Sequence, residues 1–583
     1  MTTSLFSLAT DCATDFLRHR PPAGRAGNVF GATAIPRLRR RPDFPAASYT
    51  CAVSTRTASL VSQLLRSSPL RHLPFRQFYI GSAGAALGYT TQTTVVAWLM
   101  ATLTPSALMV ALVQTASTAP ALLLGLFAGA LADLVDRRRI ILVTQIILFA
   151  TTAILGVTTL LGAIGPATLL AFTFLIGIGF AFYMPAQQAS INDLVARDEV
   201  PRAIALNAIA WNVARAVGPA LAGAAAAWLN SGSALLASAL FFVVVIVTAR
   251  GWTSPARPVR SVPETLLSGI ESGLRYTRHS PPMRALIIHN VSFALCASAL
   301  LALLPVIARD QLDLGAGGFG MLSASFGIGA VVSALLLPRV LHRKTLNAVI
   351  ASYVLVWAIS ALLVASANYT AVAIVGAFGT GAAWTGVLAS LSAGTQTSAP
   401  AWVRARSVSM NLIAVQASIA LGSAAWGSLA SLAGTRIALA AAAVTMLALL
   451  AVNRRVRLRM GDQADVTPSM PLPDLVTAFE PLPDDGPVLI QIEYRIDREN
   501  VEPFMGAIAK VEAVRRRNGA SDWLVFRDLG EDGRFVERFI IRSWAEYVRL
   551  RTRMTIADRE IQDRVEKMQH PGVPVRISRL IAA

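Results

Sequence analysis

The sequence predicts an all-α membrane protein with twelve transmembrane helices in two six-helix halves, followed by a small cytoplasmic α+β domain. Of its 583 residues, 54% are hydrophobic and only 15% are charged, and the mean hydropathy is +0.55, which is too apolar for a soluble globular protein. Apolar stretches that can cross a bilayer, which takes about 20 residues of helix, follow one another from Phe78 onward. After residue 486 the pattern changes to short alternating stretches and amphipathic helices, as in a soluble domain.

Twelve apolar stretches can be counted, with approximate bounds. Their expected ranges are 77–103, 106–134, 140–162, 166–187, 205–229, 233–250, 285–308, 315–338, 346–366, 369–391, 406–430 and 433–453. A basic stretch from Arg250 to Arg284 divides them six and six. Two halves joined by a linker are the arrangement expected of a secondary transporter built from repeats.

The connections between these stretches alternate between Arg-rich and nearly uncharged. The basic connections contain Arg137 to Arg139, Arg197 with Arg202, 257–284, 339–344, Arg404 with Arg406, and 454–459. The nearly uncharged connections lie around Thr104, Gly165, Ser231, Asn368 and Gly434, and in the segment 309–318. Short loops rich in Arg and Lys remain in the cytoplasm, so we expect the basic connections and both termini there.

The segment before the first span, residues 1–72, is rich in Arg, Pro, Ala and Ser and predicts a disordered basic extension. The alternative is that translation begins downstream, near Val53 or Leu60. The two halves are then expected at 73–250 and 285–455.

A cytoplasmic linker is expected between the halves, at 251–284. Its residues Leu266, Leu267, Ile270 and Leu274 share one helical face. That face suits either a helix on the inner membrane surface or a solvated linker helix.

A second linker, 456–486, is rich in Pro and Asp, and a soluble domain is expected at 487–583. Strand patterns cover 488–496, 523–528, 534–543 and 573–581, with a helical stripe at 499–517 and one long charged helix at 543–568. The resulting order, βαββαβ, is that of a ferredoxin-like unit.

The sequence lacks the motifs that several function classes require. Cys12, Cys51 and Cys296 are far apart and show no metal-binding spacing, so neither a zinc site nor a disulfide framework is expected. No glycine-rich loop ends in Gly-Lys-Ser/Thr, which disfavours an ATP-driven pump. The net charge of +19 lies at the ends of apolar stretches and not in a recognition motif, so no nucleic-acid partner is expected. No cofactor is expected either.

The most specific motif is GALADLVDRRR, at 129–139. An ordinary positive-inside cap explains its arginines, but it does not explain Asp133, which lies four residues from both Gly129 and Arg137. A second motif, ALNAIAWNVARAVGPALAG, places Arg215 inside an apolar span. A charge there costs roughly 2.5–3.5 kcal/mol, so Arg215 should face the bundle interior and have a partner. Packing by small residues is the alternative explanation of this second motif.

These two motifs, together with FRQFYIGSAGAALGYTTQTTVVAWLM, PAQQASINDLV, GLRYTRHSPPMRALI and PAWVRARSVSMN, resemble one branch of the major facilitator superfamily. That branch includes the enterobactin exporter and the transmembrane secretion effectors, and the resemblance covers the chain from about Phe75 to Arg455. The C-terminal domain resembles antibiotic biosynthesis monooxygenase domains, which often form dimers. The chain departs from the pattern in its long N-terminal extension and in the second-half copy GAVVSALLLPRVLHRK, which has no acid.

The resemblance implies roles for both motifs. In the first, Gly129 would be a packing glycine, Asp133 the acid of a cytoplasmic conformational lock, and Asp136, Arg137 and Arg139 the loop charges. The second would correspond to the antiporter motif of proton-coupled exporters, with residues Asn212, Arg215, Gly218, Pro219 and Gly223. The resemblance also implies a multi-pass protein of the bacterial inner membrane.

Uncharged polar residues in the spans are candidates for a substrate cavity. They are Gln92, Gln114, Gln187, Gln188, Asn290, Trp384, Asn411 and Gln416, with Asn212 as a further member. Such a cavity would take an amphipathic or aromatic small molecule, whereas the alternative is hydrogen bonding between neighbouring helices. No Asp or Glu lies in the middle of any span, so proton coupling is implied by the resemblance while its carrier stays unnamed. Asp193 and His289 lie near span ends.

The leading hypothesis is proton-coupled efflux of a drug, siderophore or secondary metabolite by alternating access, and import by the same fold is the alternative. The C-terminal domain offers three further hypotheses: a homodimer contact, a regulatory role, or a monooxygenase-like enzyme. His570, Trp523 and Trp544 are the catalytic candidates for that enzyme. A receptor or channel is disfavoured by the six-plus-six division. We expect a transporter and not an enzyme.

Overall fold

The computed structural model describes residues 69–196, 198–251, 266–469, 479 and 481–582. The side chains of residues 130, 133, 134, 266–270 and 463 also lie outside the description. The extension 1–68 and the side chain of the expected lock acid Asp133 therefore fall outside the described part of the chain. Residues 69–72, assigned above to the extension, are described and contain a short helix, η1 (Pro69–Arg71).

Six long helices form the first half. They are α3 (Leu73–Leu103), α4 (Ala107–Leu134), α5 (Arg137–Leu160), α6 (Pro166–Leu194), α7 (Val200–Trp228) and α8 (Ser231–Arg250). Local chemistry sets several starts: the side chains of Ser106, Asp136 and Asn230 accept hydrogen bonds from backbone N–H groups of α4, α5 and α8. Proline stands in the first turn of α6 and α7, where its missing N–H costs no helical hydrogen bond.

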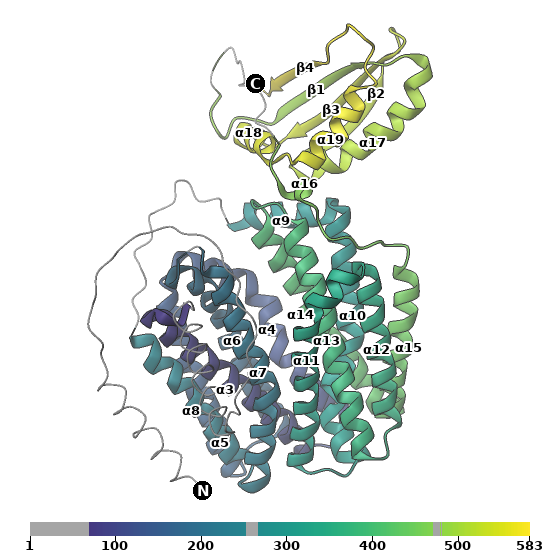
Figure 1. The fold of residues 1–583 in the computed structure, drawn as a ribbon. Helices are drawn as coiled ribbons and strands as arrows, with labels where there is room; N and C mark the ends of the chain where they lie inside the picture. The colour runs from purple at the N-terminus through teal and green to yellow at the C-terminus, as the bar shows by residue number, and fades with distance from the viewer. Residues whose placement is uncertain (1–68, 197, 252–265, 470–478, 480, 583) are drawn as a thin grey trace, which may run out of the picture. The chain divides into compact units, whose positions relative to one another are not determined.

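The second half begins with the linker helix α9 (Leu266–His279) and continues through six long helices. These are α10 (Pro281–Val306), α11 (Ala316–Arg343), α12 (Leu346–Ser366), α13 (Thr370–Ser398), α14 (Arg404–Ala433) and α15 (Thr435–Asn453). A short π-helical segment, η2 (Ile307–Gln311), follows α10. Figure 1 shows the first half in purple to blue and the second in teal to green.

Ten of the described helices are long and apolar enough to cross a membrane; α3 and α7 are not among them. Large apolar side chains lie exposed along these helices, and Leu123, Leu335 and Leu421 are each about two thirds exposed. In water such a surface would be unfavourable. It fits helices whose outer faces contact lipid.

Each half has its own packing, and two helix pairs make the most extensive contacts between the halves. In the first half α3 packs on α7 and α8, and α5 on α6 and α8; in the second, α13 packs on α11 and α12, and α10 on α14. The pairs α7 with α11 and α4 with α14 cross between the halves. Helix α10 also contacts α3 and α4, and α11 contacts α3, so the interface between the halves is bordered by α3, α4, α7, α10, α11 and α14.

The C-terminal domain is a four-stranded antiparallel sheet with helices. After α16 (Gln463–Val466) come β1 (Val488–Arg495), η3 (Arg498–Asn500), α17 (Val501–Arg517), β2 (Ser521–Arg527), β3 (Arg534–Ile541), α18 (Trp544–Arg553), α19 (Ile556–Glu566) and β4 (Arg576–Ile581). The sheet order is β2-β3-β1-β4. Alternate residues of β1 are buried, as its sequence pattern predicts, and they form one core with Phe504, Ile508 and Val511 of α17.

The single charged helix expected at 543–568 is wrong, because the structure has two helices there. The Thr555 side chain caps a new helix by accepting from the Asp558 N–H, while the Asp558 carboxylate accepts from the Thr555 N–H. This reciprocal cap satisfies the first backbone donors of α19 and ends the run begun by α18.

Candidate functional site

The contacts between the halves concentrate at one end of the bundle. We call the helix ends joined by nearly uncharged connections the charge-poor end, and those joined by Arg-rich connections the basic end. At the charge-poor end, a Cβ atom added to Gly223 of α7 would lie 2.7 Å from the Cα of Gly320 in α11. A Cβ on Gly427 of α14 would lie 2.4 Å from the Cβ of Ala111 in α4. Glycine allows both close approaches, and Gly223 is one of the residues of the second motif.

Polar contacts reinforce this closure. The Arg309 guanidinium of η2 donates to the carbonyl oxygen of Thr104 at 2.8 Å and also to that of Ala101. The Thr115 hydroxyl donates to the carbonyl oxygen of Ala420 at 2.8 Å. Each of these contacts joins a first-half residue to a second-half residue, so the structure is closed at the charge-poor end.

The basic end of α4 is packed differently. Gly125 and Gly129 have open space beside them, because a Cβ added to either would meet no atom within 4 Å. Gly129, expected as a packing glycine, therefore has room for a side chain in the described part of the structure. Helix α4 thus packs tightly on α14 at Ala111, whereas no described atom lies beside Gly125 or Gly129 near its other end.

The loop motif forms an ion pair inside the first half. The Arg137 guanidinium donates to the Asp193 carboxylate of α6 at 2.8 Å and to the carbonyl oxygen of Ala189 at 2.6 Å. Both side chains are largely buried. Asp193 was considered above only as a span-end acid, and its pairing could not be read from spacing because 56 residues separate the two.

The other loop charges have local roles. Asp136 caps α5 by accepting from the Arg138 N–H at 3.0 Å, and its carboxylate lies 4.0 Å from the Arg139 side chain, which is 82% exposed. Arg138, which is not among the expected lock residues, donates to the carbonyl oxygens of Ala249 and Arg250 at the end of α8. A basic residue at a helix C-terminus satisfies carbonyls that have no intrahelical partner.

The second motif holds α7 between α3 and α11. A Cβ on Gly218 would lie 2.1 Å from the Thr90 hydroxyl of α3. Pro219 has no N–H to donate to the carbonyl of Arg215 one turn earlier, and a Cβ on Gly327 of α11 would lie 2.3 Å from that carbonyl oxygen. Both helices therefore approach α7 closely at this motif.

The Arg215 guanidinium has a weak polar contact with the Asn212 amide oxygen at 3.5 Å. Asn212 itself donates to the carbonyl oxygen of Ala208 at 2.9 Å. Among the side chains that the structure describes, no carboxylate pairs with Arg215. The sequence predicts a partner for Arg215, and the structure offers the uncharged Asn212 amide. The positive charge of Arg215 is therefore not neutralised by a described carboxylate.

Three of the cavity candidates bond to neighbouring helices. Gln187 donates to the Ser82 hydroxyl and to the Asn207 amide oxygen, both at 2.8 Å, and Ser82 donates to Asn207 at 2.6 Å. This buried network joins α3, α6 and α7. In the second half Asn290 donates to the Asn411 amide oxygen at 2.6 Å, which joins α10 to α14.

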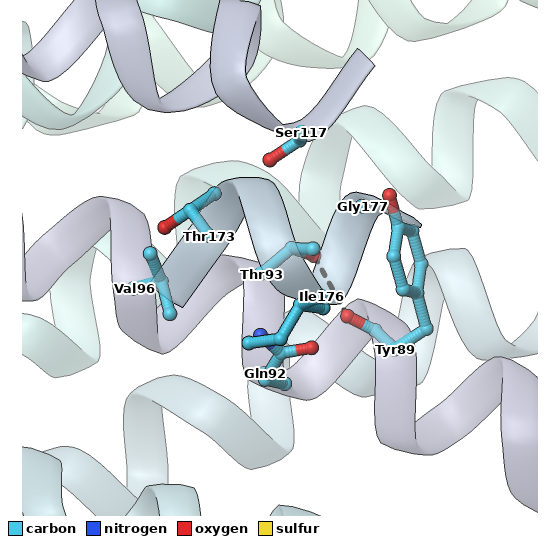
Figure 2. A pocket seen from close by; sticks show the side chains of 8 residues that line it. All are labelled: Tyr89, Gln92, Thr93, Val96, Ser117, Thr173, Ile176 and Gly177. Atoms are coloured by element: carbon cyan, nitrogen blue, oxygen red, sulfur yellow. Dashed lines mark hydrogen bonds between the residues drawn. The ribbon is translucent and has the colours of Figure 1, made fainter. Parts of the chain in front are cut away.

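Gln92 differs from those residues because its amide has no partner. Its side chain is fully buried, and neither its oxygen nor its nitrogen has a hydrogen-bond partner among the described residues. Figure 2 shows it in a small cavity lined by Tyr89, Gln92, Thr93, Val96, Ser117, Thr173, Ile176 and Gly177. The cavity volume is about 10 Å³, close to the least that one water molecule needs. The Tyr89 ring stacks on Phe180 with centroids 3.8 Å apart. Since buried polar groups are nearly always paired, a free buried amide beside a pocket indicates a site for a polar group or water.

The remaining cavity candidates are more dispersed. Gln114 and Gln416 are half-buried and Gln188 is exposed. Trp384 of α13 packs against Ala294, Val415 and Ile419, close in sequence to Asn290 and Asn411. Trp384 therefore packs on the same two helices, α10 and α14, that the Asn290–Asn411 pair joins, whereas Gln92 lies in the first half.

The C-terminal domain contains a buried charged network. Glu537, with no exposed surface, accepts hydrogen bonds at 2.9 Å from the Arg515 guanidinium, the Tyr494 hydroxyl and the Trp523 indole N–H. Burial by itself would raise the pKa of the Glu537 carboxyl, but Arg515 and the hydrogen bonds to the carboxylate hold that pKa below its ordinary value. Trp523 is therefore a structural partner of Glu537.

The other catalytic candidates of this domain lie elsewhere. His570 is half-exposed and pairs with Asp497 at 2.8 Å, and the Trp544 ring packs on Tyr547 with centroids 5.5 Å apart. Within the described residues, no group of three or more His, Cys, Asp or Glu side chains could hold a metal ion.

A family model for transmembrane secretion effectors matches residues 64–583. The chain belongs to this family. It is a multi-pass membrane transporter of the major facilitator type, and its matched region includes the C-terminal domain. The family consists of transporters, which agrees with the expectation that this protein is not an enzyme.

Two curated relatives are also transporters. The staphyloferrin A transporter of Staphylococcus aureus is 27% identical over 248 residues, which are 42% of this chain and 62% of that protein. The multidrug efflux pump Tap of Mycolicibacterium fortuitum is 27% identical over 281 residues, 46% of this chain and 67% of that protein. The match thus spans less than two thirds of the first relative.

Solved structures share the fold. A bacterial homologue of the human lysosomal transporter Spinster, in an inward-facing and occupied conformation, has a TM-score of 0.54 at 16% identity over 67% of this chain and 97% of that one. The nucleoside transporter NupG has a TM-score of 0.53 at 14% identity over 66% and 98%. At these identities the likeness shows the fold alone.

Proposed function

We propose that this protein exports a small amphipathic compound in exchange for protons, by alternating access across the bacterial inner membrane. The names of the curated relatives support this substrate range, since one denotes siderophore transport and the other multidrug efflux. Import by the same fold is the alternative, because nothing in the geometry of the helices sets the direction.

The proposed topology has twelve spans, with the basic end and both termini in the cytoplasm. Helices α3 and α7 have 31 and 29 residues, more than the roughly 20 that a bilayer requires. They pack between candidate spans, α3 against α8 and α7 against α11. The Arg-rich connections support the assignment of the basic end to the cytoplasm.

The groups around Gln92 support the proposed substrate class. Their cavity of about 10 Å³ has room for about one water molecule in this state, so a substrate would reach them only where the helices separate in another state. These groups offer one amide donor, one amide acceptor, the hydroxyl groups of Thr93 and Ser117 and the ring of Tyr89, and no charged side chain lines the cavity. Such a wall favours an uncharged polar group attached to an apolar or aromatic body. The Asn290–Asn411 pair with Trp384 offers the same chemistry in the second half.

Proton coupling rests on the likeness of the second motif to that of proton-coupled exporters. Asp193, His289 of α10 and Asp310 of η2 are titratable side chains within or beside the described spans, whereas the guanidinium of Arg215 keeps its proton.

Accumulation of a fluorescent amphipathic dye, and of a siderophore, in exporter-depleted bacteria tests the proposal. Cells that express the protein should accumulate less, and a protonophore should restore accumulation. Gln92→Leu should weaken export about two- to tenfold, because one net hydrogen bond contributes about 0.5–1.5 kcal/mol. Gln188→Leu, the same change at an exposed position, is the control. Higher accumulation in expressing cells would instead indicate import.

For the C-terminal domain we infer a ferredoxin-like unit with a dimerisation or regulatory role. Its order of elements and its antiparallel order β2-β3-β1-β4 support that fold. A monooxygenase-like activity is the alternative, and the closed hydrogen-bond network at Glu537 and Trp523 argues against these residues as its site. Turnover of a quinone or anthrone by the purified full chain would overturn the non-enzymatic role.

A further inference from the structure

Linker helix α9 makes charged contacts with the C-terminal domain. Its Arg275 pairs with Glu546 of α18, and the two side chains are only 20% and 14% exposed. A second pair joins Glu271 of α9 to Arg542 at 3.4 Å, with both side chains mostly exposed. Exposed pairs contribute little, so Arg275–Glu546 is the principal ionic contact.

The same helix is held against the second half of the transporter. The Arg406 guanidinium, in the first turn of α14, donates to the Ser272 hydroxyl of α9 at 2.7 Å. Gly273 permits this approach, since a Cβ there would lie 3.0 Å from the Cβ of Arg406. The Tyr276 ring meets the Trp402 ring edge-on with centroids 5.7 Å apart. Helix α9 therefore lies between the basic end of α14 and the C-terminal domain.

Two arginines of the C-terminal domain enclose that aromatic pair. The Arg553 guanidinium lies 4.2 Å from the centre of the Trp402 ring, and that of Arg517 lies 6.0 Å from the centre of the Tyr276 ring. Asp558 of α19 pairs with Arg517. Cation–π contacts of this kind are attractive and depend on geometry, so the domain contacts both α9 and the α13–α14 connection.

The contact is polar and incompletely satisfied. The indole N–H of Trp402 and the hydroxyls of Ser398 and Thr277 are buried without a hydrogen-bond partner among the described residues. Unpaired buried polar groups disfavour an interface relative to its hydrated, separated state. Charges and unpaired polar groups surround the Tyr276–Trp402 pair, so the contact can open with the exposure of one small aromatic surface.

Helix α14 is the second-half partner of α4. The two are close at the charge-poor end, whereas a Cβ added to Gly125 or Gly129, toward the basic end of α4, would meet no described atom within 4 Å. Closure at the basic end requires α4 to approach the first turns of α14, where α9 is now held. We propose that the docked C-terminal domain holds α9 on α14 and thereby stabilises the state that is closed at the charge-poor end, so that its release promotes the opposite state.

This regulatory role rests on alternating access in the proposed function, but its first test needs no substrate. Glu546→Arg in the full chain should release α9, and the amide hydrogen exchange of α9 should rise at least about fivefold, the lower range of couplings between sites. Adding Arg275→Glu should restore protection by rebuilding the pair in reverse. Unchanged exchange in β1 and α17 would show that the domain remains folded.

The second test measures the state of the transporter. With Cys12, Cys51 and Cys296 replaced by Ser, a Thr115→Cys thiol lies at the closed contact with Ala420. Its alkylation by a membrane-impermeant maleimide should accelerate at least about fivefold with Glu546→Arg and return to baseline in the charge-swapped double variant.

Asp532→Arg is the matched control, because it makes the same charge change in the turn between β2 and β3, where Asp532 contacts Arg498 and Arg527. It should alter neither readout. The proposal is overturned if Glu546→Arg leaves α9 exchange unchanged, or if α9 is released while alkylation at Thr115→Cys stays the same. Because no substrate is involved, these failures are distinct from a failure of export.

Discussion

The guanidinium of Arg309 donates to the carbonyl oxygen of Thr104 at 2.8 Å and so joins the second half of the transporter to the end of α3. The carbonyl groups at a helix C-terminus have no intrahelical partner and carry partial negative charge, which favours a cation there. The neighbouring residue Gln311 donates to the carbonyl oxygens of Val364, Ala365 and Ala367 in the same way. The segment η2 thus caps two helices, one from each half.

Arg309→Gln should destabilise the state closed at the charge-poor end. The variant loses a charge-assisted contact, which is worth about 1.5–3 kcal/mol. Alkylation of Thr115→Cys by an impermeant maleimide should therefore accelerate. Arg436→Gln is the control, since Arg436 lies at the same end but bonds to Asn368 within the second half. Equal rates in the two variants would show that Arg309 does not hold the halves together.

Gly223→Ala should also disfavour this closed state. The new Cβ would lie 2.7 Å from the Cα of Gly320, a backbone atom that cannot move without its helix. Overpacking of this kind costs about 1–3 kcal/mol. The control is Gly317→Ala on α11, where the Cβ would make an ordinary contact of 3.7 Å with Ala227. Crosslinking between cysteines placed on α7 and α11 at the charge-poor end measures the effect; equal yields for both variants would contradict it.

Asp193→Asn should impair transport by removing the charge that Arg137 contacts at 2.8 Å. Both side chains are largely buried, so the loss should exceed the 0–1 kcal/mol of a surface pair. An exchange of the two residues should recover part of the dye-transport rate. Arg139→Ala, at an 82% exposed side chain, should have little effect. If Arg139→Ala and Asp193→Asn reduce transport equally, the buried Arg137–Asp193 pair has no specific role.

Glu537→Gln should destabilise the C-terminal domain by about 3–5 kcal/mol, because it leaves the buried Arg515 guanidinium without its carboxylate. Hydrogen exchange of β1 and α17 in the full chain measures this loss. Glu499→Gln, an exposed site in η3, is the control. Similar exchange in both variants would show that the ion pair is dispensable.

The same network predicts a pH dependence. The pKa of Glu537 is lower in the folded domain than its ordinary value, so the unfolded chain binds the proton more readily. The stabilisation is therefore fully present above the unfolded pKa and is lost as the pH falls through the lowered folded pKa. Protection of β1 should decline in that acidic range, and it should decline less in Glu537→Gln. A parallel decline in both would assign the effect to other groups.

Sequence patterns predicted the helices and strands better than they predicted which residues contact one another. The apolar stretches and strand alternation located the long helices and the four strands, because both report whether a side chain faces water, lipid or a core. The sequence pattern does not predict the helix break at Thr555, because Thr555 and Asp558 also fit a continuous charged helix. The cavity candidates were chosen by polarity alone, and spacing could not separate Gln187, which bonds to Ser82 105 residues away, from Gln92, which has no partner.

The sequence by itself determined that the protein belongs in lipid, which of its connections are basic, and that a soluble domain follows the helices. These properties depend on composition and on one-dimensional periodicity. Only the tertiary structure decided that Gly223 meets Gly320, that Arg309 caps α3, and that Arg275 of α9 pairs with Glu546. Such contacts depend on how each helix is rotated about its axis and on which helix lies beside it, and packing among residues far apart in the chain sets both.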